Sequence, residues 1–397
     1  MAHDSQELHK YATAAAADLL CSHFGPGIPP GFVSVPGRVN LIGEHIDYHG
    51  LPVLPMALQR RVNVAFRPSS DGQVRAVSTC YGEREFPLCS NPQPGPAGDW
   101  SNYLKAAMQA AATCWKLTIG LDAAIVSDLP PAAGLSSSSA LLVGFTLALL
   151  QTNGFHPTIS ELMDILPEGE QFVGTRGGGM DHAAVLACQA GCALRIQFEP
   201  LDLSAIPIPS GWSFLVAHSL TTAEKSGAVN AEYNARRTAG ISGLQKLGLS
   251  SYRQAINTYS LGELTAFAAR LPDLECRSFL HVVTEAFRVE ECLAALRSGD
   301  ICDFGRLLIA SHASLRDQLL VSHPSLDELV QSALDAGALG ARLTGAGFGG
   351  CAIILSNLED RDRLRSELVT RYYAKHSGFD PEKHLFFATP SAGALGA

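Results

Sequence analysis

The middle of the chain carries a short segment whose residue types suit the binding of an anion. Residues 134–140 read GLSSSSA and lead directly into the apolar run 141–150, which predicts a buried helix. The first N–H groups of a helix have no partner inside it, and the helix dipole places partial positive charge at that end. The segment could therefore bind a phosphate. A serine-rich helix cap without a ligand would have the same composition.

A second segment, residues 36–50, gathers hydrogen-bonding side chains between glycines. It reads PGRVNLIGEHIDYHG and contains Arg38, Glu44, His45, Asp47 and Tyr48. Each hydroxyl of a polyol needs a donor or an acceptor held in place, so these side chains on a short turn could clasp one. For any single one of them, a charged surface loop is the simpler interpretation.

Two glycine-rich segments complete the set. Residues 174–183 read GTRGGGMDHA. The glycines would let a ligand approach the backbone closely, and Asp181 after them could act as a general base. The plainer interpretation of this Asp is a turn or a helix cap. Residues 343–355 read LTGAGFGGCAIIL and satisfy GxGxxG, but these glycines lead into a strand, which excludes a dinucleotide fingerprint. The interpretation left for residues 343–355 is a glycine-rich turn that supports a phosphate or the main active loop. No Gly-Lys-Ser/Thr occurs, so a Walker loop is excluded too.

The elements that would position these segments are a mixture of strands and helices. β-branched content and alternation predict strands at 32–35, 61–66, 123–126, 190–199, 213–217 and 351–355. Apolar periodicity predicts helices at 1–20, 103–112 and 139–152, and through most of 230–336. Strands and helices in both halves indicate an α+β architecture rather than a regular parallel sheet.

Composition narrows the class of protein. A length of 397 residues favours two lobes, and no apolar run reaches the roughly 18 residues of a membrane span. The N-terminus has no secretion-signal pattern. Ten scattered cysteines without a CxxC pair or a Cys/His cluster favour a reducing cytoplasm over a disulfide framework or a zinc site. A net charge of −9 without a basic stripe argues against nucleic acid. We therefore expect a cytoplasmic protein with small-molecule ligands and no membrane or nucleic-acid partner.

Taken in order along the chain, these segments resemble those of the galactokinase family of the GHMP small-molecule kinases, in its galactokinase and N-acetylgalactosamine kinase branch. PGRVNLIGEHIDYHG is similar to the galactokinase signature, PPAAGLSSSSA to the GHMP phosphate loop and LTGAGFGG to the third GHMP motif. The resemblance also covers DWSNYLKAA from Asp99, GGGMD ending at Asp181, SHASLRDQL from Ser311 and ATPSAGA from Ala388. It implies a two-lobed α+β GHMP kinase fold with the active site in the cleft. The lobes would be residues 1–195 and 196–397, with the last strand returning towards the first lobe.

The resemblance also implies roles for individual residues. It implies ATP-dependent phosphorylation of the C1 hydroxyl of galactose, with ATP and Mg²⁺ as cofactors. The catalytic pair would be Asp181 and Arg38. The sugar would contact Arg38, Glu44, His45, Asp47, Gly178, Asp181 and Tyr233. The nucleotide would contact Trp100, Asn102, Tyr103, Gly134, Leu135, Ser136, Ser137, Ser138 and Ser139, and the metal would be held by Ser138 and Glu170.

The residue types suit this chemistry. Phosphoryl transfer depends mainly on positioning and on neutralising charge, which backbone N–H groups, magnesium and Arg38 would do. A carboxylate with a pKa near ~4 is a weak base towards an alcohol, so the proton would leave the sugar during or after P–O bond formation. Arg38 would keep Asp181 ionised.

Several residues leave the substrate open. Ile46 and the wording GTRGGGMD lean towards N-acetylgalactosamine kinases, whereas residues 232–234 and SHASLRDQL lean towards galactokinases. The stretch 219–233 is longer than the galactokinase pattern, and His182 stands where the family usually has Gln; its imidazole could add pH dependence near neutrality. We expect a monomeric galactokinase. The alternatives are a kinase for N-acetylgalactosamine or a related hexose or uronate and, in another class, a non-catalytic galactose and ATP sensor.

Overall fold

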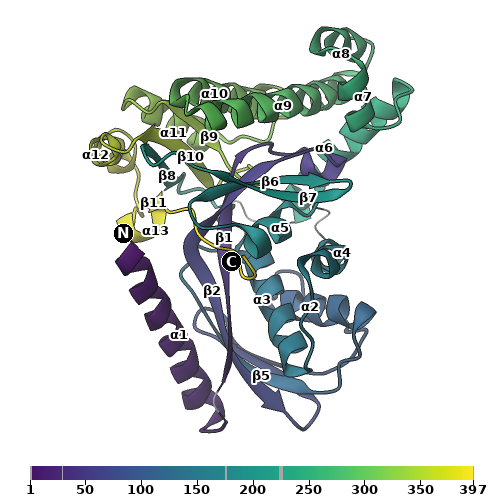
Figure 1. Cartoon of the computed structure of the whole chain (residues 1–397), viewed down its shortest axis with the longest axis vertical. Helices are drawn as coiled ribbons and strands as arrows, with labels where there is room; N and C mark the ends of the chain where they lie inside the picture. Colours follow the sequence, from purple (N-terminus) through teal and green to yellow (C-terminus); the bar gives the residue numbers. More distant parts are fainter. Residues whose placement is uncertain (1, 29, 175–176, 223–226, 397) are drawn as a thin grey trace.

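The computed structural model describes residues 2–28, 30–174, 177–222 and 227–396, and within them the strands form three sheets. Figure 1 shows the long helices of the second half of the chain lying above a tall sheet formed by the first half. In the described part of the chain, no helix is both long enough and apolar enough to cross a membrane.

The first half of the chain forms a five-stranded sheet in the order β1-β2-β5-β3-β4. Its strands are β1 (Gly31–Ile42), β2 (Leu54–Ser69), β3 (Gln73–Ser78), β4 (Gly82–Pro87) and β5 (Gly120–Ser127). Only β3 and β5 pair in parallel; the other neighbours are antiparallel.

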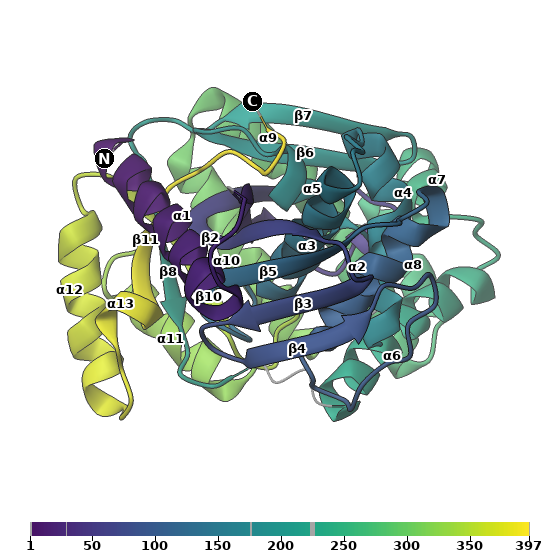
Figure 2. The ribbon, with the colours of Figure 1, turned by 90° about the horizontal axis from the view of Figure 1, so that it is seen from below.

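Alternation along the strands gives this sheet two buried faces. Successive side chains of a strand point to opposite sides. Val64 of β2 packs against α3 (Ser137–Thr152), whereas the next residue, Ala65, clusters with Leu20 of α1 (Ala2–Phe24). Seen from below in Figure 2, α1 lies across the strands on the side away from α3. Because α3 is apolar on all sides, it is buried between the sheet and its neighbouring helices.

The second half of the chain builds a four-stranded antiparallel sheet in the order β11-β8-β10-β9. Its strands are β8 (Trp212–His218), β9 (Gly340–Leu343), β10 (Cys351–Asn357) and β11 (Leu385–Ala388). Ile353 of β10 faces the main core, and Ile354 faces α11 (Pro324–Asp335) and α12 (Arg361–Arg371). This sheet is therefore buried on both faces as well.

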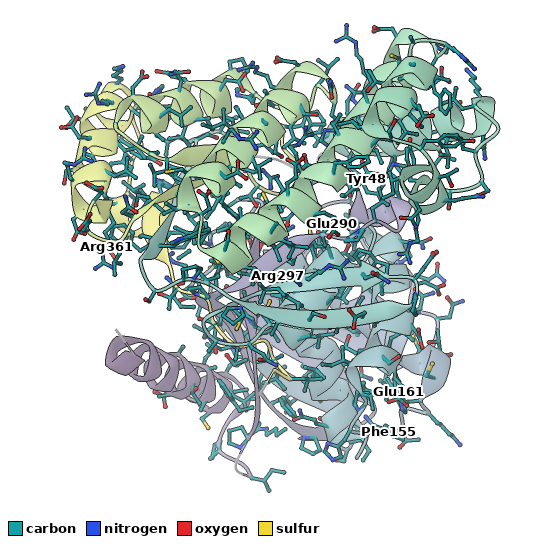
Figure 3. All side chains as sticks on the ribbon, turned by 45° about the horizontal axis from the view of Figure 1, so that its top comes forward. Tyr48, Phe155, Glu161, Glu290, Arg297 and Arg361 are labelled. Atoms are coloured by element: carbon teal, nitrogen blue, oxygen red, sulfur yellow. The ribbon has the colours of Figure 1, made fainter. Side chains whose placement is uncertain are left out.

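The remaining elements connect and cover the two sheets. They are α2 (Ser101–Cys114), α4 (Ile159–Gly169), α5 (Met180–Ala187), α6 (Gly227–Lys246), α7 (Tyr252–Thr258), α8 (Leu261–Ala268), α9 (Asp273–Ser298), α10 (Ile301–Asp317) and α13 (Pro381–His384), the short helices η1 (Asp47–His49), η2 (Glu170–Val173) and η3 (Tyr373–Lys375), and the hairpin β6 (Cys192–Phe198) and β7 (Leu201–Pro207). Figure 3 shows Glu290 of α9 on the side of that helix that faces this hairpin. Its carboxylate accepts a hydrogen bond from Arg195 of β6 at 3.3 Å.

The segment after β11 crosses from the second sheet to the first half of the chain. The Ser391 N–H donates to Ala57 O of β2 at 3.0 Å. The N–H groups of residues 393, 394 and 395 donate to the carbonyls of Cys188, Val185 and Leu186 at 2.8–2.9 Å. These acceptors lie in or just after the last turn of α5, where helix carbonyls have no intrahelical donor. Strand β11 pairs with β8 and also contacts the first half directly, because the Gln59 side-chain amide of β2 donates to Phe387 O at 2.7 Å.

Most predicted elements are confirmed, but several elements, among them α4 and β7, were not predicted. The predicted strands coincide with parts of β1, β2, β5, β8 and β10, and the strand predicted at 190–199 extends beyond β6 at both ends. The predicted helices coincide with α1, α2, α3 and the α6 to α11 region, with residue 1 outside the described part of the chain. The interpretation of residues 36–50 as one turn is wrong in its first part, because β1 continues through Arg38 to Ile42. The hairpin of β3 and β4 was not predicted, since GEREFP carries no alternating apolar pattern.

Candidate active site

One cavity of about 400 Å³ holds most of the residues singled out from the sequence. Those that line it are Arg38, Glu44, His45, Asp47, Trp100, Tyr103, Gly134, Leu135, Ser136, Ser137, Ser138, Glu170, Gly178, Asp181 and Tyr233. Asn102 and Ser139 are not among the lining residues. A cavity of this size suits a small-molecule ligand with a few fixed polar contacts. Of the glycine-rich segment 174–183, residues 175 and 176 lie outside the described part of the chain.

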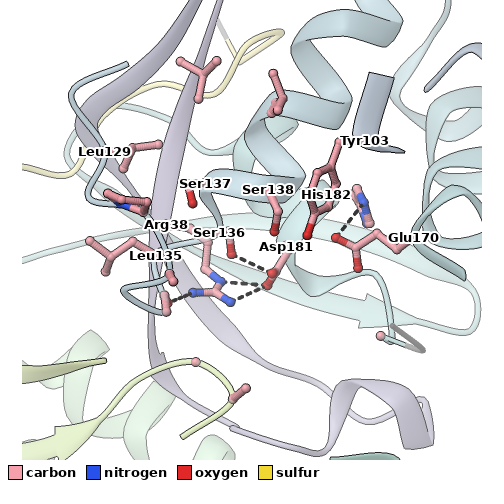
Figure 4. Close-up of a pocket in the computed structure, with 18 of the residues that line it drawn as sticks. Arg38, Tyr103, Leu129, Leu135, Ser136, Ser137, Ser138, Glu170, Asp181 and His182 are labelled. Atoms are coloured by element: carbon pink, nitrogen blue, oxygen red, sulfur yellow. Dashed lines mark hydrogen bonds and ion pairs between the residues drawn. The ribbon is translucent and has the colours of Figure 1, made fainter. Parts of the chain in front are cut away.

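Arg38 and Asp181 form a close ion pair inside this cavity (Figure 4). Arg38 Nε and Nη2 both lie 2.7 Å from Asp181 Oδ1, and Arg38 Nη1 donates to Gly134 O, also at 2.7 Å. The second carboxylate oxygen accepts from Ser136 Oγ at 2.6 Å. The Arg38 side chain is 5% exposed and that of Asp181 is 25% exposed, so a ligand can still reach the carboxylate.

The surroundings of Asp181 keep its carboxyl group ionised. Burial alone would raise the pKa of Asp181, but the charge of Arg38 and the hydrogen bond from Ser136 outweigh it, and the pKa lies below its usual value. An ionised carboxylate of this kind can accept a proton during a reaction, while the guanidinium beside it can stabilise developing negative charge.

The serine-rich loop has the geometry of a helix N-terminus. Helix α3 begins at Ser137, and Ser136 before it has a left-handed backbone, with φ of 57°. The glycine-rich turn after β9 packs against this loop backbone to backbone: a Cβ on Gly345 would lie 2.7 Å from Gly134 O, and one on Gly350 would lie 2.9 Å from Ala133 O. Only glycine permits this approach. The glycine-rich turn therefore supports the serine-rich loop, which agrees with the interpretation of residues 343–355 as a turn that supports an active loop.

Glu170 lies beside the start of α3 and is a possible oxygen ligand for a cation. Its Oε1 accepts from Ser139 Oγ at 2.6 Å and lies 3.6 Å from His182 Nε2. The serine bonded to Glu170 is thus the fully buried Ser139, while Ser138 lines the cavity. No group of three or more His, Cys, Asp or Glu side chains among the described residues is arranged to hold a metal ion. A cation here would need ligands from the substrate and water, which is how Mg²⁺ is often bound.

The turn between β1 and η1, together with the first residue of η1, brings the side chains of Glu44, His45 and Asp47 into the cavity. Glu44 accepts from Arg342 Nη2 at 2.5 Å and from Gly345 N at 3.0 Å. His45 Nε2 lies 3.1 Å from Ala346 O, which can only accept, so Nε2 carries the proton and Nδ1 accepts from Tyr48 Oη at 3.0 Å. Burial lowers the pKa of His45 to about 3, so the ring is neutral. Figure 3 shows Tyr48 where this turn meets the helices of the second half.

Asp47 differs from Asp181 in its electrostatic surroundings. Its Oδ2 accepts from the Gly178 N–H at 3.1 Å. Burial, and then the negative charge of Asp181, raise the pKa of Asp47 to about 6, because the backbone donors offset them only in part. Tyr233 of α6 lines the cavity here, with its ring 5.2 Å from that of His45 and 5.7 Å from that of Tyr48.

Aromatic residues line the remaining part of the cavity. Trp100 and Tyr103 lie at the start of α2, and Tyr81 from the turn between β3 and β4 stacks on Trp100 with a centroid distance of 6.2 Å. Flat apolar rings suit a nucleotide base. Asn102 points elsewhere, since its side chain accepts from Gly95 N and donates to Pro96 O. It holds the loop before α2 in place.

Comparison with known proteins identifies the family. The galactokinase galactose-binding signature matches residues 21–68, the GHMP kinase N-terminal domain matches 102–189 and the GHMP kinase C-terminal region matches 292–375. The chain is 36% identical to the galactokinase of a Roseiflexus species over 87% of this chain and 88% of that one. The chain belongs to the galactokinase family.

Further relatives agree with this assignment. The bovine galactokinase is 36% identical over 86% of this chain and 87% of its own. The structure of the Lactococcus lactis galactokinase complexed with galactose superimposes with a TM-score of 0.85 at 27% identity, covering 96% of this chain and 98% of that one. A mevalonate kinase structure, at 19% identity and a TM-score of 0.60, shares the fold alone. The predicted family, the α+β GHMP kinase fold and the assignment as an enzyme, a sugar kinase, are confirmed; as a kinase it uses ATP.

Some residues of this galactokinase family member that shape the cavity were not singled out from the sequence. Arg342 is fully buried and binds Glu44, and Tyr81 lies half-exposed against Trp100. Arg342 stands in the apolar strand β9, where one charged residue gives no pattern. An unpaired Arg is rarely buried, however, so a lone Arg in a strand next to a glycine-rich motif is a signal that could have been used.

Proposed function

We propose that the chain transfers the γ-phosphoryl group of ATP to the anomeric C1 hydroxyl of galactose, giving galactose 1-phosphate and ADP. The observation that carries this proposal is the ion pair of Arg38 and Asp181 next to the N-terminus of α3, in one cavity with the polar turn of Glu44, His45 and Asp47. An anion-binding helix end, an ionised carboxylate and a set of hydroxyl-binding groups together suit phosphorylation of a sugar.

In this proposal Asp181 accepts the proton of the sugar hydroxyl and Arg38 stabilises charge on the transferred phosphoryl group. Because the pKa of Asp181 is lowered, the carboxylate is too weak a base to deprotonate an alcohol in advance. The proton therefore moves during or after formation of the new P–O bond. Gly134, Leu135 and Ser136–Ser138 hold the phosphates, and Trp100 and Tyr103 hold the nucleotide base. Of the other residues expected at the nucleotide, Ser139 is buried behind the loop and bonded to Glu170, and Asn102 fixes the loop before α2.

The charges of the cavity favour a divalent cation beside ATP. Of the four carboxylates among the described lining residues, Glu44 is paired with Arg342 and Asp181 with Arg38, whereas Asp47 and Glu170 have no guanidinium partner among the described ion pairs. We propose that Ser138 and Glu170 hold Mg²⁺, since a hydroxyl and a carboxylate are the hard oxygen ligands it prefers. When bound, the ion would neutralise charge on the phosphates.

We further propose that residues 1–195 and 196–397 act as two lobes around the cleft, and that the sugar contacts Arg38, Glu44, His45, Asp47, Gly178, Asp181 and Tyr233. The galactose-bound relative supports galactose as the sugar. The ten cysteines are all free, which suits a reducing cytoplasm, and we propose a monomer there with sugar and ATP as its ligands. A net charge of −9 supports the absence of a nucleic-acid partner.

The test is an ADP-release assay with galactose, N-acetylgalactosamine, glucose, galacturonate and arabinose, compared by kcat/KM, the quantity that defines specificity. The expected result is release that depends on sugar and is fastest with galactose. A higher kcat/KM for N-acetylgalactosamine would transfer the proposal to that substrate. Binding of galactose and ATP without ADP release would indicate a sensor.

A further inference from the structure

The turn that carries Glu44, His45 and Asp47 has a strained backbone. Gly43 has φ of 96° and His45 has φ of 61°. A non-glycine residue seldom adopts such a φ, and it keeps it only where the surroundings impose it. Gly43 also has no room for a side chain, because a Cβ there would lie 3.0 Å from Val53 Cα and 3.1 Å from the side chain of Val289. Some part of the structure must therefore hold this turn.

Helix α9 supplies two side chains that bond directly to the backbone of this turn. Glu285 Oε1 accepts from the Gly43 N–H at 3.0 Å, and His281 Nε2 lies 3.0 Å from Glu44 O. The two residues are four apart and so lie on one face of the helix. Both are completely buried. One face of α9 thus binds two successive residues of the turn, through the N–H of Gly43 and the carbonyl of Glu44.

Further contacts fix these two side chains in place. Glu285 Oε1 also accepts from Ser311 Oγ of α10 at 2.7 Å, and Oε2 is paired with Arg288 Nε at 2.8 Å. His281 Nδ1 faces Ser314 Oγ of α10 at 2.9 Å. Because the carbonyl of Glu44 can only accept, His281 Nε2 carries the proton. The support therefore extends from the turn through α9 to α10.

The ionisation of both groups suits these hydrogen bonds. Burial would raise the pKa of Glu285, but the charge of Arg288, with smaller contributions from His281 and Arg342, lowers it to about 2, so the carboxylate is an ionised acceptor. Burial lowers the pKa of His281 to about 4, so the ring is neutral above that pH and presents one N–H.

We propose that His281 and Glu285 are positioning residues for sugar binding, which fix the backbone of residues 43–44 and thereby aim Glu44, His45 and Asp47 at the sugar. This inference rests on the proposed function, because it takes that turn as the sugar site. Neither residue lines the cavity, so both act through the turn. The described hydrogen bonds of His281 and Glu285 go to the turn and to α10, so we expect nucleotide binding at α2 and α3 to depend on them much less than sugar binding.

The test compares His281→Met with His281→Gln. Met has no N–H to donate to Glu44 O, whereas the amide of Gln can donate there. We expect His281→Met to weaken galactose binding by about ten-fold, the size of effect typical when a buried polar group, here the Glu44 carbonyl, loses its hydrogen-bond partner. The affinity for ATP and kcat at saturating galactose should change by less than about three-fold, and His281→Gln should restore most of the galactose affinity.

The controls separate positioning from loss of stability. Leu296→Ala lowers the stability of α9 near its other end, and at a similar loss of melting temperature it should leave galactose affinity unchanged. If His281→Met does not fold, Ser314→Ala, which removes the second partner of His281 together with the contact of Ser314 Oγ to Gln318 Oε1 at 2.8 Å, should weaken galactose binding by about three-fold, and Gln318→Ala, which removes that second contact alone, should not. Equal loss of ATP and galactose affinity, equal loss in Leu296→Ala, or normal galactose affinity in His281→Met would overturn the inference. Absence of galactose binding in the unmodified chain, measured by calorimetry, would instead contradict the proposed function.

Discussion

Asp181 and Asp47 line the same cavity, but the groups around them differ. Asp181 is paired with a buried guanidinium and a serine hydroxyl, and its pKa is lowered. Asp47 receives the backbone N–H of Gly178, and burial together with the charge of Asp181 raises its pKa to about 6. Asp181 is therefore ionised near neutral pH, whereas Asp47 titrates at about pH 6. Turnover and sugar affinity should therefore respond to different changes.

The largest effect is expected for Asp181→Asn. The amide keeps the shape of the side chain but cannot accept a proton, so kcat should fall by about 10³-fold, within the range typical for a general base. Galactose affinity should change by only about three-fold, because the polar turn is untouched. ADP release and calorimetry measure the two effects. Near-normal kcat would contradict the role of Asp181, and Asp202→Asn on the exposed part of β7 is a matched control that should have no effect.

Arg38→Met should have the next largest effect, a loss of about 10²-fold in kcat. Without the guanidinium, burial becomes the dominant influence on Asp181 and its pKa rises above the usual value. Protonated Asp181 cannot act as the base, so activity should be lost as the pH falls through this raised pKa. A pH profile of kcat shows whether its acid limb, the pH range in which kcat falls, moves to higher pH. Arg38→Lys keeps the charge and should move the limb less; an unmoved limb in Arg38→Met would show that Arg38 does not control Asp181.

Asp47 should give a pH dependence of sugar binding and not of turnover. Its carboxylate is an ionised acceptor above about pH 6 and is protonated as the pH falls through that value. If the ionised form binds the sugar, KM for galactose should rise by about ten-fold between pH 7 and pH 5, while kcat changes little. Asp47→Asn should have a raised KM that no longer depends on pH. A flat KM in the unmodified chain would refute this assignment.

Ser136→Ala should give the smallest effect. It removes one hydrogen bond from Asp181 Oδ2, and a single bond to a charged group corresponds to a loss in kcat of roughly three- to ten-fold. Steady-state kinetics at saturating sugar measure it. The control is Ser137→Ala, because Ser137 also lines the cavity but makes none of the described hydrogen bonds to Asp181. Equal effects on kcat from both variants would mean that the loop acts on the phosphates alone.

Local patterns predicted the elements well where one face is apolar. The strand around Val64 follows from alternation, whereas the strand around Ile353 and helix α3 follow from continuous apolar runs. The continuation of β1 through Arg38 was missed, because glycine and charged residues at 37–44 are typical of a turn. Long-range pairing with β2 overrides this local preference.

The site was predictable in its residue types but not in its pairings. Resemblance singled out both Arg38 and Asp181, although they are far apart in the sequence, yet nothing local shows that Ser136 completes the pair or that Ser139, not Ser138, bonds to Glu170. His281 and Glu285 were not predicted, because polar residues inside a long helix usually belong to a solvated face. Their contacts depend on how α9 packs on the turn, and such packing leaves no pattern within α9.

The segment after β11 makes helix α5 depend on residues that are synthesised much later than the helix itself. Helix α5 carries Asp181, and three carbonyls at its end are bonded by N–H groups of residues 393–395. A helix this short is marginal without outside support. On the ribosome, at about 5–20 residues per second, α5 emerges on the order of ten seconds or more before those residues. A chain that ends at residue 390 has every catalytic side chain but lacks these three N–H donors, and it is therefore expected to lose turnover, which an ADP-release assay on the truncated chain would check. Translation itself sets the moment at which the active site is completed.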